Sequence, residues 1–157
     1  MSTRLNNIPR EKDYFVSVCS SDLPDNVLTM IETSMRLCES ILRYTETLYP
    51  FAAVDLDGDL QPVFTHDAAK LNQGEDGSSR MIECLEQVIF NHTVHASNAN
   101  SILIFAAVIE TKNNQFTDVI VADVSLCEGA TQQFYFPVMY QAGNVSIGAP
   151  LTNLLSY

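Results

Sequence analysis

The sequence predicts an α+β domain in which a single antiparallel sheet of about five strands carries two helices packed against it. Two segments, 24–47 and 81–92, repeat apolar residues at the three- and four-residue spacing of a helix. Other segments are rich in β-branched and aromatic residues and are separated by turn residues. The length of 157 residues suits a single globular domain, 1–157, in which 1–20 forms an N-terminal strap or an edge strand.

The first helix is predicted from residue 24 to about residue 47. Pro24 suits the first turn, Ser21 or Asp22 can cap it, and Pro50 prevents the helix from continuing. Such an apolar face packs against a sheet. The residues that form this face are Val27, Leu28, Ile31, Met35, Cys38, Ile41, Leu42 and Leu48.

A β-hairpin is predicted next, from two apolar runs, 51–56 and 60–65, that flank Asp57 and Gly58. Asp-Gly between apolar runs is a strong signal for a two-residue hairpin turn. Pro62 cannot donate a ladder hydrogen bond. Its strand is therefore expected at a sheet edge, or with the proline nitrogen facing outward.

A second helix follows a polar loop at 72–79, and Ser78 or Ser79 can cap it. The spacing of its apolar residues again predicts one buried face. We expect that face to consist of Met81, Ile82, Leu85, Val88, Ile89 and His92.

Three further strands, 102–109, 116–126 and 131–140, most simply form an antiparallel meander. Turns are expected at 112–114 and 128–129. The first of these strands does not alternate between apolar and polar residues, which suits a strand covered on both faces or lying at a dimer contact.

The predicted order of helix, two strands, helix and three strands resembles the profilin-like folds, in particular the roadblock and longin group. The resemblance is one of topology over most of the chain and includes no diagnostic motif. It implies a non-enzymatic dimerisation or regulatory module. The final helix that is usual in roadblock proteins has no counterpart in 148–157.

The charge balance bears on the class of partner. Eight Lys and Arg residues against 19 Asp and Glu residues give a net charge of −11. A field of this sign repels phosphate backbones and anionic lipids, so we expect no nucleic-acid partner and no membrane partner. The chain also lacks an apolar run near the ~20 residues that a membrane span requires.

The N-terminal segment and the cysteines bear on the compartment. Residues 1–10 contain no apolar stretch typical of a signal peptide, so a cytoplasmic location is expected. Cys19, Cys38, Cys84 and Cys127 lie far apart and form no C-x-x-C pair. This pattern predicts four reduced and mostly buried thiols.

Two groups of residues are candidates for metal binding. Three carboxylates within 55–59 suggest calcium, but the glycine lies at the wrong position for an EF-hand, and a hairpin turn explains the segment better. His92 and His95 lie three residues apart on the second predicted helix, and His66 and Asp67 could add ligands. A packed histidine and a histidine near the end of a helix explain His92 and His95 better than a metal site does, so no metal and no cofactor is favoured.

Two aspartates interrupt an otherwise apolar strand. A carboxylate in apolar surroundings can have a raised pKa that suits acid–base work. Asp118 and Asp123 are five residues apart, so they point to opposite faces and at most one of them faces the core. Each can instead mark a point where the strand reaches solvent.

The last part of the chain, 129–157, carries no charged side chain. Its aromatic and flexible apolar residues are typical of protein–protein interfaces, although the same residues would suit a strand packed into the core of its own chain. An edge strand that pairs with a second copy would form a C2 homodimer. The expected interface residues are Phe134, Tyr135, Phe136, Met139 and Tyr140.

Two functions follow as hypotheses. The leading one is a non-catalytic, homodimeric interaction or regulatory module of unknown partner. The alternative is a small-molecule or metal-dependent enzyme whose pocket lies near His66, Asp67, His92 and His95. The alternative requires these four side chains to converge beside a pocket.

Overall fold

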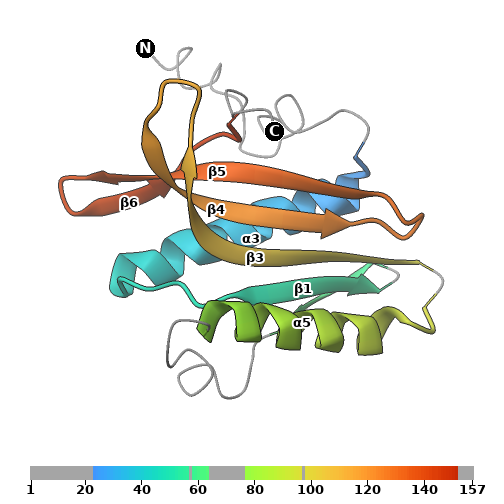
Figure 1. Cartoon of the computed structure of the whole chain (residues 1–157). Helices are drawn as coiled ribbons and strands as arrows, with labels where there is room; N and C mark the ends of the chain where they lie inside the picture. The colour runs from blue at the N-terminus through green and yellow to red at the C-terminus, as the bar shows by residue number, and fades with distance from the viewer. Residues whose placement is uncertain (1–22, 57, 64–76, 97, 152–157) are drawn as a thin grey trace, which may run out of the picture.

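The protein is described by a computed structural model that covers residues 23–56, 58–63, 77–96 and 98–151. Two helices and six strands lie in these ranges (Figure 1). The helices are α3 (Asp25–Tyr44) and α5 (Gly77–Thr93). The strands are β1 (Phe51–Leu56), β2 (Asp59–Val63), β3 (Ala99–Glu110), β4 (Phe116–Ser125), β5 (Thr131–Gln141) and β6 (Asn144–Ile147).

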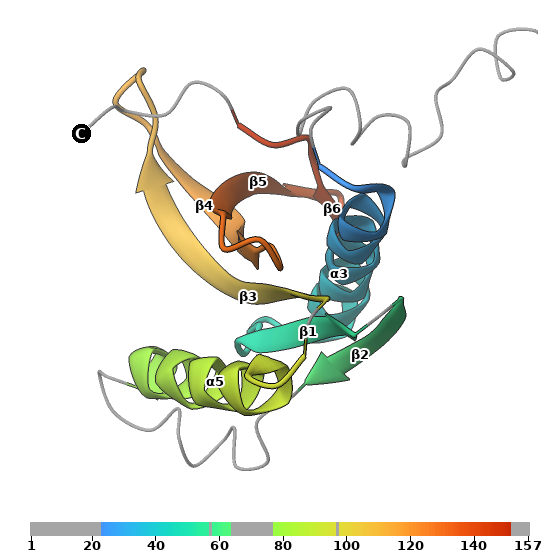
Figure 2. The same cartoon turned by 90° about the vertical axis from the view of Figure 1, so that its right-hand side faces the viewer.

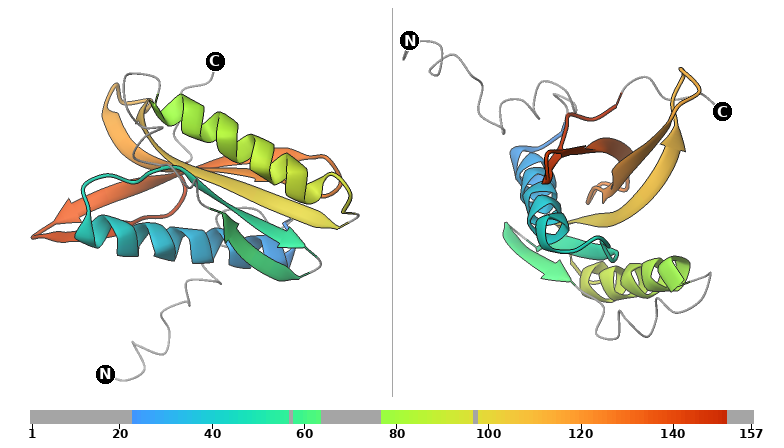
Figure 3. Two further views of the ribbon diagram at one scale, coloured as in Figure 1. Left: turned by 90° about the horizontal axis from the view of Figure 1, so that it is seen from below. Right: turned by 90° about the vertical axis from the view of Figure 1, so that its left-hand side faces the viewer.

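The six strands form one antiparallel sheet in the order β2-β1-β3-β4-β5-β6. The predicted α+β class is therefore confirmed, with six strands in place of about five. The sheet is strongly curled, and α3 lies along its open side, between β6 and β1 (Figures 2 and 3). The second helix, α5, covers the outer face of the sheet at β1 and β3.

The helix α3 forms because its apolar residues fall on one face, and that face packs into the concave side of the sheet. Fully buried residues of the helix, such as Val27 and Ile31, join a core to which the inner face of every strand from β1 to β5, except the edge strand β2, contributes. The backbone carbonyl of Pro24 accepts hydrogen bonds from the N–H groups of Val27 (3.0 Å) and Leu28 (3.1 Å) at its start. The predicted capping residues, 21 and 22, lie outside the described residues.

The helix ends three residues earlier than predicted. Thr45 is extended, with φ −134°, and both its N–H and its hydroxyl donate to the carbonyl of Ile41 at 2.9 Å. The first is the last i→i−4 bond of the helix, and the second gives one of the terminal carbonyls a side-chain donor. Leu48 is buried as expected, but it reaches the core from the segment after the helix.

The packing of α5 is lighter. Met81 and Leu85 are fully buried, whereas Ile82, Val88 and Ile89 are only half-buried. The prediction that His92 belongs to the buried face is wrong, because His92 lies in the last turn of the helix and is exposed. The spacing of apolar residues defines an apolar stripe along the helix. The area of sheet beneath the helix determines how much of that stripe is buried.

The hairpin turn at Gly58 is confirmed. Leu56 pairs with Asp59, which leaves a two-residue loop, and Gly58 has the positive φ of 90° that such a loop requires. Asp57 itself lies outside the described residues. Pro62 lies on β2 at the edge of the sheet, as predicted from its missing N–H group.

The strand 102–109 is covered on both faces only in its first half. Ile104 faces α3 and Leu103 faces α5, and both are buried. Further along β3, Ala106 and Val108 are exposed. The predicted turns after β3 and after β4 are confirmed, with positive φ at Asn114 and Gly129.

The sixth strand, β6, was not predicted, and it changes the environment of β5. Ala142 and Gly143, with φ of 49° and 81°, form a tight turn that pairs β6 with β5. Beyond β6, the N–H of Gly148 donates to Pro137 at 2.9 Å and the N–H of Leu151 donates to Tyr135 at 2.8 Å. The expectation that β5 is an edge strand is therefore wrong, because these bonds occupy its outer edge.

Neither α3 nor α5 combines the length and the apolar composition that a membrane-crossing helix needs.

Candidate binding surface at the open end of the sheet

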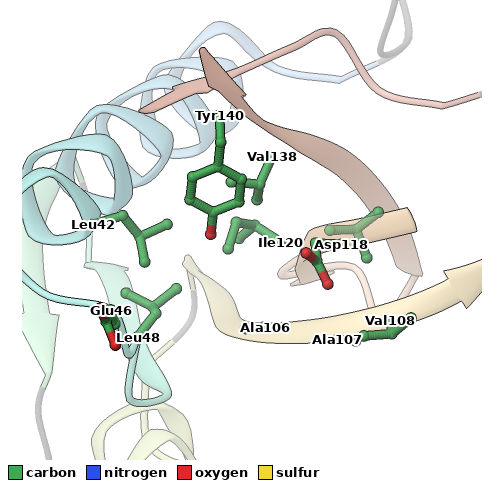
Figure 4. A pocket seen from close by; sticks show the side chains of 11 residues that line it. Leu42, Glu46, Leu48, Ala106, Ala107, Val108, Asp118, Ile120, Val138 and Tyr140 are labelled. Atoms are coloured by element: carbon green, nitrogen blue, oxygen red, sulfur yellow. The ribbon is translucent and has the colours of Figure 1, made fainter. Parts of the chain in front are cut away.

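A hollow of about 330 Å³ lies where the curled sheet extends past the last turn of α3. In Figure 1 this end of the molecule is on the left, where the last turn of α3 and the β5–β6 turn both lie. Figure 4 shows the hollow from close by. Its lining residues are Leu42, Glu46, Leu48, Ala106, Ala107, Val108, Asp118, Val119, Ile120, Val138 and Tyr140.

The hollow continues the inner face of the sheet beyond the helix that covers it. Side chains at every second position of a strand share a face, so β3 presents Ile104 and Val108 to the same side and β5 presents Phe136 and Tyr140. Ile104 and Phe136 lie under α3 and are 0% exposed, whereas Val108 and Tyr140 are each 61% exposed. The apolar face of the sheet is thus longer than the helix packed on it.

The uncovered face extends to the tip of the β3–β4 hairpin. Val108 pairs with Asp118, and Glu110 pairs with Phe116, which is 76% exposed. All four side chains lie on the inner face, because they keep the alternation of Ile104 and Ile120. Each strand contributes one apolar and one acidic residue. Val108 therefore lies diagonally across from Phe116, and Glu110 lies diagonally across from Asp118.

We call this region the open-end surface. It joins the uncovered inner face of the hairpin to two exposed residues that flank the hollow, one from the segment after α3 and one from β5. Its residues are Glu46, Val108, Glu110, Phe116, Asp118 and Tyr140.

The open-end surface is negatively charged. Its carboxylates are those of Glu46, Glu110 and Asp118, and in the part of the chain that the structure describes none of them forms an ion pair or a side-chain hydrogen bond. Among the described residues that line the hollow, none is Lys, Arg or His. Figure 4 shows the Tyr140 ring projecting into the hollow, with Glu46 and Asp118 on opposite sides. An apolar floor with acidic sides is therefore the chemistry that this end of the sheet presents.

Asp118 and Asp123 point to opposite faces of β4, as predicted. Asp118 pairs with Val108 on the inner face, and Asp123 pairs with Leu103 on the outer face. Only Asp118 belongs to the hollow.

The predicted metal ligands are not brought together within the described residues. His92 and His95 are exposed, and His92 Nδ1 lies 2.8 Å from the carbonyl oxygen of Val88 on its own helix. In 23–56, 58–63, 77–96 and 98–151, no three His, Cys, Asp or Glu side chains are grouped to hold a metal ion. His66 and Asp67 lie outside these ranges, so the convergence of all four residues stays a prediction.

The acidic segment at 55–59 acts as part of the hairpin, as expected. Asp55 is buried, and its carboxylate accepts hydrogen bonds from the N–H of Gly58 at 2.9 Å and from Asn26 Nδ2 at 2.5 Å. The first bond closes the turn, and the second joins the turn to the first helical turn of α3. Asp55 therefore has a structural role.

The cysteines differ from the prediction. Cys38, Cys84 and Cys127 are free, as expected, but only Cys38 is buried, and the other two are exposed. Burial in the core, with a smaller effect of the neighbouring Glu39, raises the pKa of the Cys38 thiol to about 12. Cys38 is therefore a packing residue and not a nucleophile at neutral pH. Cys127 lines a second, smaller hollow of about 200 Å³, and none of the described residues that line it is charged.

The predicted interface residues on β5 divide between core and surface. Phe134 and Phe136 are buried in the core of their own chain, with ring centroids 6.4 Å apart, so they offer no surface to a partner. Tyr135 is half-buried, and Met139 and Tyr140 are exposed. Self-association through the last three residues stays a prediction.

Sequence reasoning missed Glu46, Val108, Glu110 and Phe116. The sequence contained one signal for this exposed apolar surface. The run 102–109 is apolar throughout, and Phe116 follows the next turn. Comparison of the chain with protein-family models, with curated proteins and with solved structures finds no match. The function is therefore inferred from the chemistry of the open-end surface.

Proposed function

We propose that the protein is a non-catalytic interaction module that binds a partner through the open-end surface. The observation that supports this proposal is that Val108 and Tyr140, each 61% exposed, flank a hollow on one face of the sheet. Phe116, which is 76% exposed, extends this apolar face towards the tip of the β3–β4 hairpin. Exposed apolar residues scattered singly are normal in proteins, but a contiguous group marks an interaction site. Aromatic residues are also the side chains most enriched at protein interfaces.

The scaffold favours this role because it holds the surface in place. Val108 and Phe116 lie on strands that are hydrogen-bonded to each other, and Tyr140 lies on the β5–β6 hairpin. A partner that binds these residues would not have to order a loop, which lowers the entropic cost of binding.

Self-association is the form of this function that the sequence predicts. Pairing of β5 with a second copy is no longer a route to it, because β6 and the segment that follows occupy the edge of that strand. Tyr135 and Met139 on the outer face and Tyr140 at the open end are the residues through which a dimer would form. The enzyme alternative gains no support from the contacts of His92 and His95.

The experiment compares photo-crosslinking at two exposed phenylalanines. p-Benzoylphenylalanine replaces Phe116 on the open-end surface in one sample and Phe90, which is 57% exposed on α5, in the other. The protein is produced in its own host and irradiated, and adducts are identified by mass spectrometry. We expect a discrete adduct, with another protein or with a second copy, from position 116 and not from position 90. Absence of an adduct at 116, or identical adducts at both positions, would overturn the proposal.

A further inference from the structure

We infer that the open-end surface binds an extended peptide segment in which the side chains of one face, at every second position, alternate between apolar residues and Lys or Arg. The inference rests on the proposed function and names the class of partner. Three features support it, namely the pattern of charge on the β3–β4 hairpin, the size of the hollow, and the net charge of the chain.

The pattern of charge comes from the register of the hairpin. Val108 lies opposite Asp118 and Glu110 lies opposite Phe116, so each acidic side chain has an apolar neighbour both along its strand and across the pair. Directly opposite side chains in an antiparallel pair are about 5 Å apart at Cβ. A segment lying on this face would place apolar and basic side chains at the same alternating spacing. Glu46 adds a third carboxylate on the far side of the hollow.

The basic residues nearest in the sequence do not neutralise these carboxylates. Arg43 lies in the last turn of α3 and Lys112 in the β3–β4 turn, and neither lines the hollow. In the described part of the chain, no ion pair reaches Glu46, Glu110 or Asp118. With respect to the described residues, these carboxylates are therefore available to cations that a partner brings.

The size of the hollow suits an anchoring side chain. A volume of about 330 Å³ lies at the small end of the range for ligand pockets, roughly 300–1,000 Å³. The exposed side chain of Phe116 extends the apolar surface beyond the hollow along the same strand face. An elongated segment would use both parts, with one apolar side chain in the hollow and the next against Phe116.

The net charge favours a basic partner over a second copy. Each chain carries −11, and the open-end surface contributes three carboxylates of its own. Two such surfaces facing each other would bring like charges together, which lowers affinity and slows association. A basic segment would instead be attracted over distances of about 10 Å at moderate salt.

The test measures binding of synthetic peptides to the full chain by fluorescence anisotropy. The probe is a labelled eight-residue peptide, Leu-Ser-Lys-Ser-Leu-Ser-Lys-Ser, in which leucine and lysine alternate along one face of the extended chain. The two matched peptides carry glutamine or glutamate in place of lysine. The protein variants are Asp118→Asn and Val108→Ser on the open-end surface. Asp123→Asn, on the opposite face of the same strand, is the matched control. Circular dichroism checks that each variant is folded.

We expect the lysine peptide to bind most tightly and the glutamate peptide not to bind. Asp118→Asn should lower the affinity for the lysine peptide roughly two- to fivefold, as the loss of one exposed ion pair implies. Val108→Ser should lower this affinity further, and Asp123→Asn should leave it unchanged. Binding should also fall as salt is raised.

Other outcomes overturn the inference in distinguishable ways. If the glutamine peptide binds as well as the lysine peptide and Val108→Ser weakens both, the proposed function stands and the basic partner is wrong. If Asp118→Asn and Asp123→Asn weaken binding equally, the attraction is a general effect of net charge. If no peptide binds and native mass spectrometry finds a dimer that Val108→Ser dissociates, a second copy is the partner. If no peptide binds and the chain is monomeric, the inference fails, and the crosslinking at position 116 decides whether the proposed function stands.

Discussion

The carboxylate of Glu39 on α3 accepts a hydrogen bond of 3.0 Å from the backbone N–H of Ile147 on β6, a residue 108 positions away. In an antiparallel strand successive N–H groups point to opposite sides, and the N–H of Gly148 donates to Pro137 on β5. The N–H of Ile147 therefore faces away from the sheet, where the helix supplies its acceptor. This bond joins α3 to the last strand and closes the open side of the curled sheet (Figure 2).

Glu39→Ala should lower the free energy of unfolding by about 1–2 kcal/mol, because it leaves a half-buried N–H group without an acceptor. Urea unfolding followed by circular dichroism measures the change. Glu32→Ala is the control, since it removes the i,i+4 ion pair with Arg36 at 2.8 Å within the same helix, and such pairs are worth about 0.3–0.5 kcal/mol. Both variants place alanine in the same helix, so helix propensity cancels. Equal effects of the two substitutions would show that the bond to Ile147 does not stabilise the fold.

Asp55→Ala should lower the free energy of unfolding by about 2 kcal/mol, because two donors, the N–H of Gly58 and Asn26 Nδ2, lose a buried acceptor. Asn26→Ala removes one of the two bonds and should have the smaller effect. The double variant tests coupling, which we expect at about 0.5–1 kcal/mol for residues in direct contact. Strictly additive effects of the two substitutions would argue against the bond between α3 and the hairpin turn.

Stability should depend on alkaline pH through Cys38. Its thiol is held protonated in the folded state, with a pKa raised from 9.0 to about 12, chiefly by burial. In the unfolded chain the Cys38 thiol ionises above pH 9.0. The free energy of unfolding therefore keeps its full value below that pH, as far as this group is concerned, and falls as pH rises from 9 to 12. At pH 10 the loss is about 1.4 kcal/mol relative to pH 8.

The measurement is urea unfolding of the wild type and of Cys38→Ala at pH 8 and pH 10. The other titrating groups are common to both proteins, so the difference between them isolates Cys38. The wild type should lose more stability than the variant over this interval. The same pH dependence in both proteins would contradict the protonated, buried thiol.

Amide hydrogens of α5 should exchange faster than those of α3. The fully buried contacts of α3 belong to the main core, whereas α5 rests on the small cluster of Ala52, Leu85 and Leu103. Helices with fewer buried apolar contacts open at lower free energy. Hydrogen–deuterium exchange with mass spectrometry measures both helices in one sample. Slower exchange in α5 than in α3 would indicate that the outer layer is the more stable one.

Local features of the fold follow from the sequence because their causes are local. The spacing of Val27, Ile31 and Met35 makes one face of a helix apolar, whatever it packs against. The Asp57–Gly58 pair predicts its turn because positive φ at glycine depends on the residue itself. The order of helix, hairpin, helix and meander was predictable in the same way. The ends of α3 and the exposure of His92 were not, because they depend on which parts of the sheet lie beneath each helix.

The tertiary structure alone decides the difference between core and binding surface. Phe136 and Tyr140 lie four residues apart on the same face of β5, yet Phe136 is 0% exposed and Tyr140 is 61% exposed. Their sequence pattern is equivalent, since both are aromatic residues at alternating positions of one strand. The first lies under α3 and the second lies beyond its end, and the curl of the sheet that brings α3 over Phe136 results from contacts between residues distant in the chain. Composition and periodicity determine the elements and their apolar faces, and the packing of those elements determines which part of a face is left to bind a partner.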